Sequence, residues 1–208
     1  MAAETKSLFV TKVYDSAPLP PTKAEAILQD LEGACAFIAS EDRAGQQWSQ
    51  AKAYKGYTSY GSLTDLTRRA NAFADLKKIL DSEIHRFADA LAFDLGGRRL
   101  KLDHMWINIL KPGGGHTGHI HPLSVISGTF YVATPEGSGA LKLEDPRLSQ
   151  MMAAPPRRAD AEQGLRPFIY LHPEAGRLFL WESWLRHEVE PNRARSPRVS
   201  ISFNYGWG

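Results

Sequence analysis

The chain has 208 residues, and its 25 lysine and arginine residues exceed its 23 aspartate and glutamate residues by only two. A net charge this small gives no reason to expect binding to nucleic acid or to an acidic membrane surface. Hydrophobic residues make up 43% of the chain and charged residues 23%, as in ordinary globular proteins, which excludes a wholly disordered chain.

The sequence also lacks membrane and export signals. No stretch approaches the roughly 20 apolar residues of a membrane span, and the start, MAAETKSLFV, has neither the basic residues nor the apolar run of a signal peptide. The single cysteine, Cys35, excludes an internal disulfide and a multi-cysteine metal site. We therefore expect a cytoplasmic protein in which histidine, aspartate or glutamate would hold any metal.

The first half of the chain predicts one strand followed by two helices. Residues 8–14 are β-branched and aromatic, which favours a strand. Two helical periods follow a proline-rich turn; residues 41–70 between them show no clear period, and Gly96 and Gly97 are expected to end the second helix. The expected core positions are Ile27, Leu28, Leu31, Ala34, Phe37 and Ile38 in the first helix, and Phe73, Leu76, Leu80, Ile84, Phe87 and Leu91 in the second.

The second half reads as a β-structure, because no long helical period returns after Gly97. Short strand-like runs separated by turns predict a sandwich or jelly roll. We predict one mainly β domain over residues 1–208, with a helical cover of about 1–98 and a β-core of about 99–208. The expected strands lie within 100–110, 124–133, 139–144, 167–172, 176–182 and 197–206.

The segment 145–167 interrupts this pattern of strands and turns. It is a long insertion without a recognisable period. Segments of this kind are usually either functional lids or disordered loops. Both alternatives are open from the sequence.

Three of the seven histidines fall within six residues: His116, His119 and His121. On a strand, side chains two residues apart face the same side, so His119 and His121 can approach one metal ion. A third ligand must come from a distant segment. His187, which follows the apolar run 176–182, is the best candidate.

Other interpretations of the histidines remain open. The H-x-H pattern alone also suits an exposed or hydrogen-bonded pair without a metal. His116 could be a substitute ligand, a residue supporting the ligands or an exposed side chain. His104, within an expected strand, could be structural or functional.

Arg198 and Ser200 share one face of the last expected strand. A guanidinium beside a hydroxyl is costly to bury without an anion. A dicarboxylate is a natural partner, because the arginine fork matches a carboxylate. The alternative is an ordinary surface arginine after a proline turn.

These motifs occur in an order that resembles a known family. The runs HIHPLSVISGTFYV, GALKLEDPR, GRLFLWESWLRHEVEPN and PRVSISFN, within residues 104–206, resemble the 2-oxoglutarate- and Fe(II)-dependent oxygenases, in particular a bacterial and phage branch with an H-x-H-P motif. The resemblance implies a double-stranded β-helix, a cupin-like jelly roll, flanked by two helices. It implies that His119 and His187 bind iron and that Arg198 with Ser200 holds the distal carboxylate of 2-oxoglutarate. Tyr131 is expected to assist at that carboxylate, and Asn108 to line the pocket.

The sequence departs from the wider family at one ligand. Where that family has His-x-Asp or His-x-Glu, this chain has His121. His121 could bind and complete a three-histidine site, could leave the position open, or could change the preferred metal. We favour ligation by His121, in a site whose missing negative charge is supplied by bound 2-oxoglutarate.

The resemblance implies a non-haem dioxygenase that uses Fe(II), 2-oxoglutarate and O₂, and hydroxylates an unknown small molecule or side chain with release of succinate and CO₂. No catalytic residues beyond the metal ligands are expected. Trp181 and Trp184 flank the last ligand and could wall the site or fill core, of which we favour core filling. The alternatives are a cupin-type metal enzyme without a cosubstrate and a non-catalytic jelly-roll binding module. A homodimer is expected only because such dimers are common.

Overall fold

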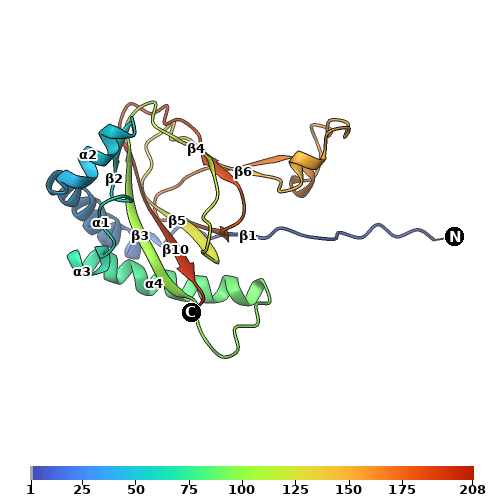
Figure 1. Cartoon of the computed structure of the whole chain (residues 1–208), viewed down its shortest axis with the longest axis horizontal. Coiled ribbons are helices and arrows are strands. Elements are labelled where there is room, and N and C mark those ends of the chain that lie inside the picture. The colour runs from blue at the N-terminus through green and yellow to red at the C-terminus, as the bar shows by residue number, and fades with distance from the viewer. Residues whose placement is uncertain (1) are drawn as a thin grey trace.

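The computed structural model describes residues 2–208, which form two antiparallel sheets and four α-helices, with the helices in the first half of the chain (Figure 1). The helices are α1 (Pro21–Glu41), α2 (Arg43–Ala51), α3 (Leu66–Arg69) and α4 (Asn71–Ala90). Among these described residues, no helix has the length and apolar character needed to span a bilayer.

The larger sheet has six strands in the order β1-β8-β5-β10-β3-β2, and the smaller has four in the order β4-β9-β6-β7. The strands of the larger sheet are β1 (Val13–Asp15), β8 (Leu178–Glu182), β5 (Ile126–Ala133), β10 (Arg198–Gly206), β3 (Lys101–Leu110) and β2 (Gly56–Thr58). Those of the smaller sheet are β4 (His116–His119), β9 (His187–Val189), β6 (Leu141–Glu144) and β7 (Phe168–Leu171).

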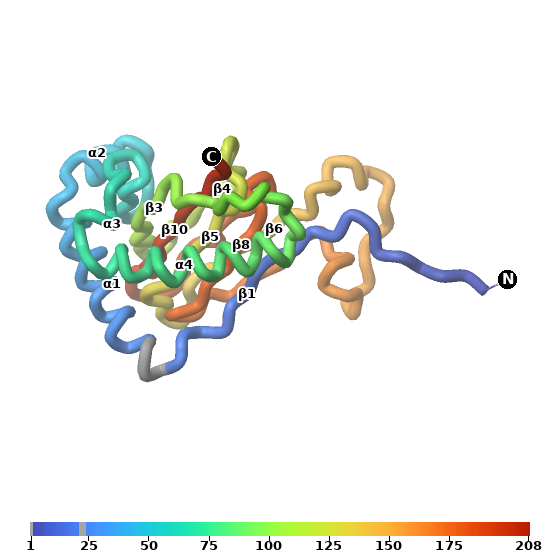
Figure 2. The backbone as a smooth tube through the Cα atoms, turned by 90° about the horizontal axis from the view of Figure 1, so that it is seen from below, coloured from blue at the N-terminus to red at the C-terminus, as the bar shows by residue number. Residues whose placement is uncertain are grey.

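Helices α1 and α4 cover one face of the larger sheet (Figure 2). Their apolar residues recur every three or four positions, so each helix presents one stripe to the strands. Buried residues of β3, β5, β8 and β10 complete this main core. The buried helical residues are Leu31, Cys35 and Ile38 of α1, and Phe73, Leu76, Leu80, Ile84, Phe87 and Ala88 of α4.

The predicted mainly β fold with a jelly-roll core is confirmed, and the two expected covering helices correspond to α1 and α4; the short helices α2 and α3 between them were not predicted. The region 41–70 contains α2, β2 and α3, which are too short for a period to be visible in sequence. Asp42 starts α2 by accepting a hydrogen bond from the Gly45 N–H at 2.9 Å. Strand β2 exists because it pairs with β3, a tertiary contact.

Several predicted boundaries were wrong. The strand expected over 8–14 is reduced to β1, because only residues 13–15 pair with β8. Phe37, expected in the core, is 67% exposed on α1. Helix α4 ends at Ala90 rather than at Gly96, and Ala92 adopts a left-handed backbone with φ of 55° just beyond it. The single-domain assignment stays a prediction.

The 145–167 insertion joins β6 to β7 and extends away from the body of the molecule, on the same side as the N-terminal segment (Figures 1 and 2). It contains two short 3-10 turns, η1 (Leu148–Gln150) and η2 (Gln163–Leu165). In this arrangement it does not cover either sheet as a lid.

Candidate metal centre and cosubstrate pocket

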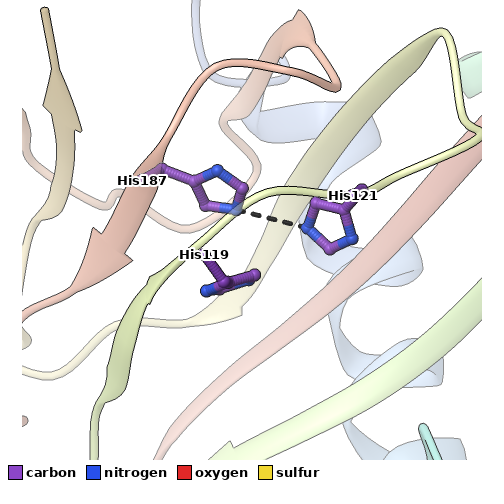
Figure 3. A group of neighbouring side chains, drawn as sticks. All are labelled: His119, His121 and His187. Atoms are coloured by element: carbon purple, nitrogen blue, oxygen red, sulfur yellow. Dashed lines mark hydrogen bonds between the residues drawn. The ribbon is translucent and has the colours of Figure 1, made fainter. Parts of the chain in front are cut away.

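Three histidines from two segments of the chain converge between the two sheets (Figure 3). Strands β4 and β9 pair with His119 opposite His187. His121 lies two residues beyond β4, where its N–H donates to the Ser183 carbonyl at 3.0 Å. The three ligand atoms all lie within 4.8 Å of one another. The predicted cluster therefore forms, although His121 reaches it from a loop rather than by strand alternation.

Backbone carbonyls fix the ring orientation of two members of the cluster. The Nδ1 of His119 lies 2.7 Å from the Thr117 oxygen, and the Nδ1 of His187 lies 2.8 Å from the Leu185 oxygen. A carbonyl only accepts hydrogen bonds, so each Nδ1 carries the hydrogen and each Nε2 keeps a lone pair. Such an outward hydrogen bond is typical of metal-binding histidines.

Burial keeps the imidazoles of His187 and His121 neutral. It lowers the pKa of His187 to about 3 and that of His121 to about 4, with the neighbouring histidines adding to the effect. Three imidazole nitrogens at this spacing suit one divalent ion that bonds each at about 2.1 Å after small side-chain movements. Imidazole is a good ligand for iron, so the cluster fits Fe(II).

The cluster borders a cavity of about 670 Å³ between the sheets, whose wall also includes Arg198, Tyr131 and Asn108. Arg198 is 2% exposed and donates to the Gly139 carbonyl at 3.1 Å and to the Ser200 hydroxyl at 3.3 Å. Ser200 is buried beside Arg198 and does not line the cavity. The four predicted cosubstrate residues therefore lie together, and Ser200 contacts Arg198 without lining the cavity itself.

Three buried polar atoms at this cavity have no hydrogen-bond partner among residues 2–208: Tyr131 Oη, Trp181 Nε1 and Arg198 Nε. Buried polar groups are almost always paired, because leaving one unpaired costs about 1–3 kcal/mol. All three are N–H or O–H donors that lack an acceptor, and all three belong to residues that line the cavity. A carboxylate is an acceptor of the kind they lack, and 2-oxoglutarate carries two.

Tyr54, which the sequence did not single out, completes the polar wall. Its hydroxyl lies 2.8 Å from His116 Nε2 and 3.3 Å from the Asn108 side-chain oxygen, to which Thr58 also donates at 3.0 Å. His116 is thus bound to Tyr54 and lies outside the three-histidine cluster. Nothing in the aperiodic 41–70 region marks Tyr54, which enters the cavity only through tertiary packing.

An aromatic wall leads outward from the cluster. The Trp106 ring lies 5.7 Å from the His121 ring and 5.2 Å from the ring of Tyr60, a cavity-lining residue that is 48% exposed. His104 packs against the same rings and is not a member of the histidine cluster. Trp184, expected to fill core, is 47% exposed.

Comparison with known proteins agrees with this geometry. Residues 104–204 match the family model described as "Putative 2OG-Fe(II) oxygenase". No curated protein matches the chain.

Several solved structures share the fold. A prolyl hydroxylase from Trichoplax adhaerens, in complex with a hypoxia inducible factor oxygen degradation domain peptide fragment, is 15% identical over 94% of this chain and 83% of its own, with a TM-score of 0.60. A prolyl-4-hydroxylase from Pseudomonas putida is 16% identical over 95% of this chain and 94% of its own, with a TM-score of 0.59. A 2OG-Fe(II) oxygenase family oxidoreductase from Burkholderia pseudomallei is 16% identical over 67% of this chain, with a TM-score of 0.50, and the match covers only 59% of that protein.

At these identities the structural matches establish the jelly-roll fold, while the family model covers the segment that carries the three clustered histidines and the predicted cosubstrate residues. Enzymes of that family use Fe(II), 2-oxoglutarate and O₂, and the histidine cluster is compatible with this set. Assignment to an H-x-H-P branch stays a prediction. Residues 104–204, which contain all three clustered histidines and Arg198, therefore match the 2OG-Fe(II) oxygenase family over about half of the chain.

Proposed function

We propose that the protein is a hydroxylase that converts R–H, 2-oxoglutarate and O₂ into R–OH, succinate and CO₂. One atom of O₂ enters the product and the other enters succinate. The observation that carries the proposal is a single cavity bordered both by the three-histidine cluster and by a buried arginine with an unpaired Nε. Two structurally similar proteins are prolyl hydroxylases, which supports hydroxylation as the outcome.

His119, His121 and His187 would hold the metal. Bound Fe(II) supplies the activation of O₂ and the oxidative decarboxylation of 2-oxoglutarate, chemistry that side chains cannot perform. The three ligands are neutral and contribute no negative charge. The site therefore favours an anionic cosubstrate, which compensates the charge of the ion.

Arg198 would bind the distal carboxylate of 2-oxoglutarate. Its hydrogen bonds to Gly139 and Ser200 hold the guanidinium in place, so little side-chain freedom is lost when the anion arrives. Tyr131 is fully buried, with Arg198 Cζ 5.3 Å from its ring centre and its own hydroxyl unpaired. It would donate a second hydrogen bond to the same carboxylate.

The substrate would enter along the aromatic wall of Trp106 and Tyr60. These rings line the cavity next to His121, so a small molecule or a side chain packed on them would exclude water from the reacting carbon. Asn108 and Tyr54 would form the polar side of the pocket. The lone cysteine, which excludes an internal disulfide, supports a cytoplasmic location as part of the proposal.

The deciding experiment is anaerobic titration of the protein with Fe(II) and 2-oxoglutarate, followed by exposure to O₂. We expect a weak visible charge-transfer band, then O₂ uptake that produces succinate and requires 2-oxoglutarate. O₂ uptake that ignores 2-oxoglutarate would indicate the cupin-type alternative. A protein that binds no metal and whose melting temperature is indifferent to EDTA would indicate a binding module.

A further inference from the structure

His121 differs from the other two clustered histidines in what contacts the far side of its ring. His119 and His187 each place Nδ1 against a backbone carbonyl. The Nδ1 of His121 instead lies 3.4 Å from the side-chain Nδ2 of Asn204. An amide side chain carries both a donor and an acceptor, so this contact, unlike a carbonyl, can accommodate either tautomer of the imidazole.

In the observed orientation Asn204 donates to His121, since its nitrogen faces the ring and its oxygen accepts from Ser127 Oγ at 2.8 Å. The hydrogen of neutral His121 therefore sits on Nε2. That atom lies 3.2 Å from the Nε2 of His187, which holds a lone pair and accepts it (Figure 3). This hydrogen bond closes the cluster without an ion, but a protonated Nε2 cannot bind a cation.

Rotating the Asn204 amide by half a turn exchanges the positions of its oxygen and nitrogen, and so reverses the direction of both hydrogen bonds. Its oxygen then accepts from a hydrogen on His121 Nδ1, which frees the Nε2 lone pair, and its nitrogen donates to Ser127. A hydroxyl can accept as readily as it donates. Ser127 Oγ also lies 2.8 Å from Ser183 Oγ, so its own hydrogen can turn to that atom.

The surrounding backbone holds these groups in register. Asn204 of β10 is paired directly with Ser127 of β5, and Ser127 and Ser183 are buried. Ser183 is also the residue whose carbonyl accepts the His121 N–H. The same contacts thus fix the position of His121, while the Asn204 amide can still adopt either of its two orientations.

We propose that Asn204 is the positioning residue that makes His121 a metal ligand: its amide turns as the ion binds and selects the tautomer with hydrogen on Nδ1. The inference rests on the metal site of the proposed function and on no step of the reaction. A carboxylate ligand has no tautomers and would need no such partner. Asn204, Ser127 and Ser183 would thus be the support that a third histidine requires.

The test uses two substitutions at Asn204 in the full chain. Asn204→Asp supplies only acceptors and therefore fixes the His121 tautomer with hydrogen on Nδ1. Asn204→Leu has a similar volume but neither donates to nor accepts from His121. Asn71→Asp, at an exposed position of α4, is the control for the added charge. We expect Asn204→Leu to weaken Co(II) binding by about 10–100-fold, and Asn204→Asp to bind within about threefold of the wild type or more tightly.

Two-bond ¹H–¹⁵N correlation spectra of the histidine rings report the tautomers directly, without O₂ or 2-oxoglutarate. In the metal-free wild type we expect hydrogen on Nε2 of His121, and on Nδ1 after addition of Zn(II). In Asn204→Asp it should be on Nδ1 before the metal is added. A folded Asn204→Leu variant with unchanged Co(II) affinity, or a His121 that keeps hydrogen on Nε2 with Zn(II) bound, would overturn the inference.

The outcome is separate from that of the proposed function. The tautomer change could occur in a protein that never consumes 2-oxoglutarate, in which case the proposed function fails and this inference stands. Conversely, 2-oxoglutarate turnover with an unchanged His121 tautomer would contradict the inference about Asn204 and leave the proposed function intact. Circular dichroism and thermal melting of each variant establish that it is folded.

Discussion

The two faces of the larger sheet have opposite compositions, and β10 shows the division most clearly. Its residues facing the helices are Val199, Ile201, Phe203 and Tyr205, all within the main core. The alternating residues are Arg198, Ser200, Ser202 and Asn204, which line the cavity or support residues that do. Strands β3 and β5 repeat this division, with Ile107 and Phe130 on the core side and Asn108 and Tyr131 on the cavity side.

Burial alone therefore does not distinguish core from site, because residues on both faces of these strands are almost fully buried. The core face is stabilised by removing apolar surface from water. The cavity face holds polar groups that are costly to bury and, in three cases, unpaired. Substitutions on one face should therefore change the free energy of unfolding, and those on the other should change ligand binding.

The largest effect is expected from Phe203→Ala on the core face. Phe203 is fully buried, so its loss removes apolar contact and leaves a cavity. The free energy of unfolding should fall by about 3–5 kcal/mol, measured by urea denaturation. The Co(II) affinity of the folded protein should be unchanged; a parallel loss of metal binding would show that the two faces are not separable.

His119→Ala tests the opposite case. His119 is partly exposed, so its removal should change the free energy of unfolding of the metal-free protein by less than about 1 kcal/mol. Metal affinity should fall at least about 100-fold, because a ligand is lost outright. Isothermal titration with Co(II) measures this, and an affinity within tenfold of wild type would place the metal elsewhere.

Arg198→Met separates cosubstrate from metal binding. Methionine keeps much of the buried volume but removes the charge and the hydrogen bonds. We expect 2-oxoglutarate to bind about 30-fold or more weakly, with Fe(II) binding retained, as measured by anaerobic spectroscopic titration. Equal loss of both ligands would indicate misfolding, which circular dichroism would detect.

Asp42→Ala should have a smaller effect, on stability alone. Burial raises the pKa of Asp42, but hydrogen bonds from Ser62, the Gly45 N–H and Tyr57 outweigh it and leave the pKa below its ordinary value. A carboxylate with a lowered pKa stabilises the fold above its unfolded-state pKa, near 4, and loses that contribution as pH falls through the lower folded-state value. Loss of this helix cap should cost about 1 kcal/mol near neutral pH.

The pH dependence of the Asp42→Ala effect tests whether the charge of the carboxylate contributes to stability. The stability difference between wild type and Asp42→Ala should shrink as the pH is lowered below 4, since both proteins then lack the charge. Urea denaturation at several pH values measures it. A difference that stays constant down to pH 2 would show that the carboxylate charge of Asp42 contributes nothing.

The smallest effect is expected from shortening the 145–167 insertion, for example by replacing residues 149–164 with a short glycine-serine linker. None of these residues lines the cavity. Stability should change by less than about 0.5 kcal/mol, and 2-oxoglutarate affinity should not change. A loss of cosubstrate binding would mean that the segment folds over the cavity in solution.

Much of the fold was visible in the sequence, but the helices and strands of residues 41–70 were not. The six strand runs after Gly97 and the apolar period of α4 are long enough for their spacing to identify them. Strand β2, by contrast, has three residues and forms only because β3 lies beside it. Short elements of this kind depend on contacts distant in sequence, which no local pattern contains.

The candidate site was predicted in the same uneven way. The sequence identified His119, His121 and His187, because histidine spacing and the order of the motifs are local properties. It did not identify Tyr54 or Asn204, since a single tyrosine or asparagine has no distinguishing neighbours. Their importance comes from distances of 2.8 Å and 3.4 Å to histidines that lie 62 and 83 residues away.

The β-core, the three metal-ligand candidates and the candidate carboxylate-binding arginine could therefore be predicted from the sequence, since strand periodicity and residue chemistry are local properties of the chain. The tertiary structure was needed to show that His121 comes from a loop, that Ser200 accepts a hydrogen bond from Arg198 outside the cavity, and that the Asn204 amide contacts the His121 imidazole. Those outcomes depend on strand register and on which donor meets which acceptor. Both are settled when the whole chain packs and its buried polar groups must find partners.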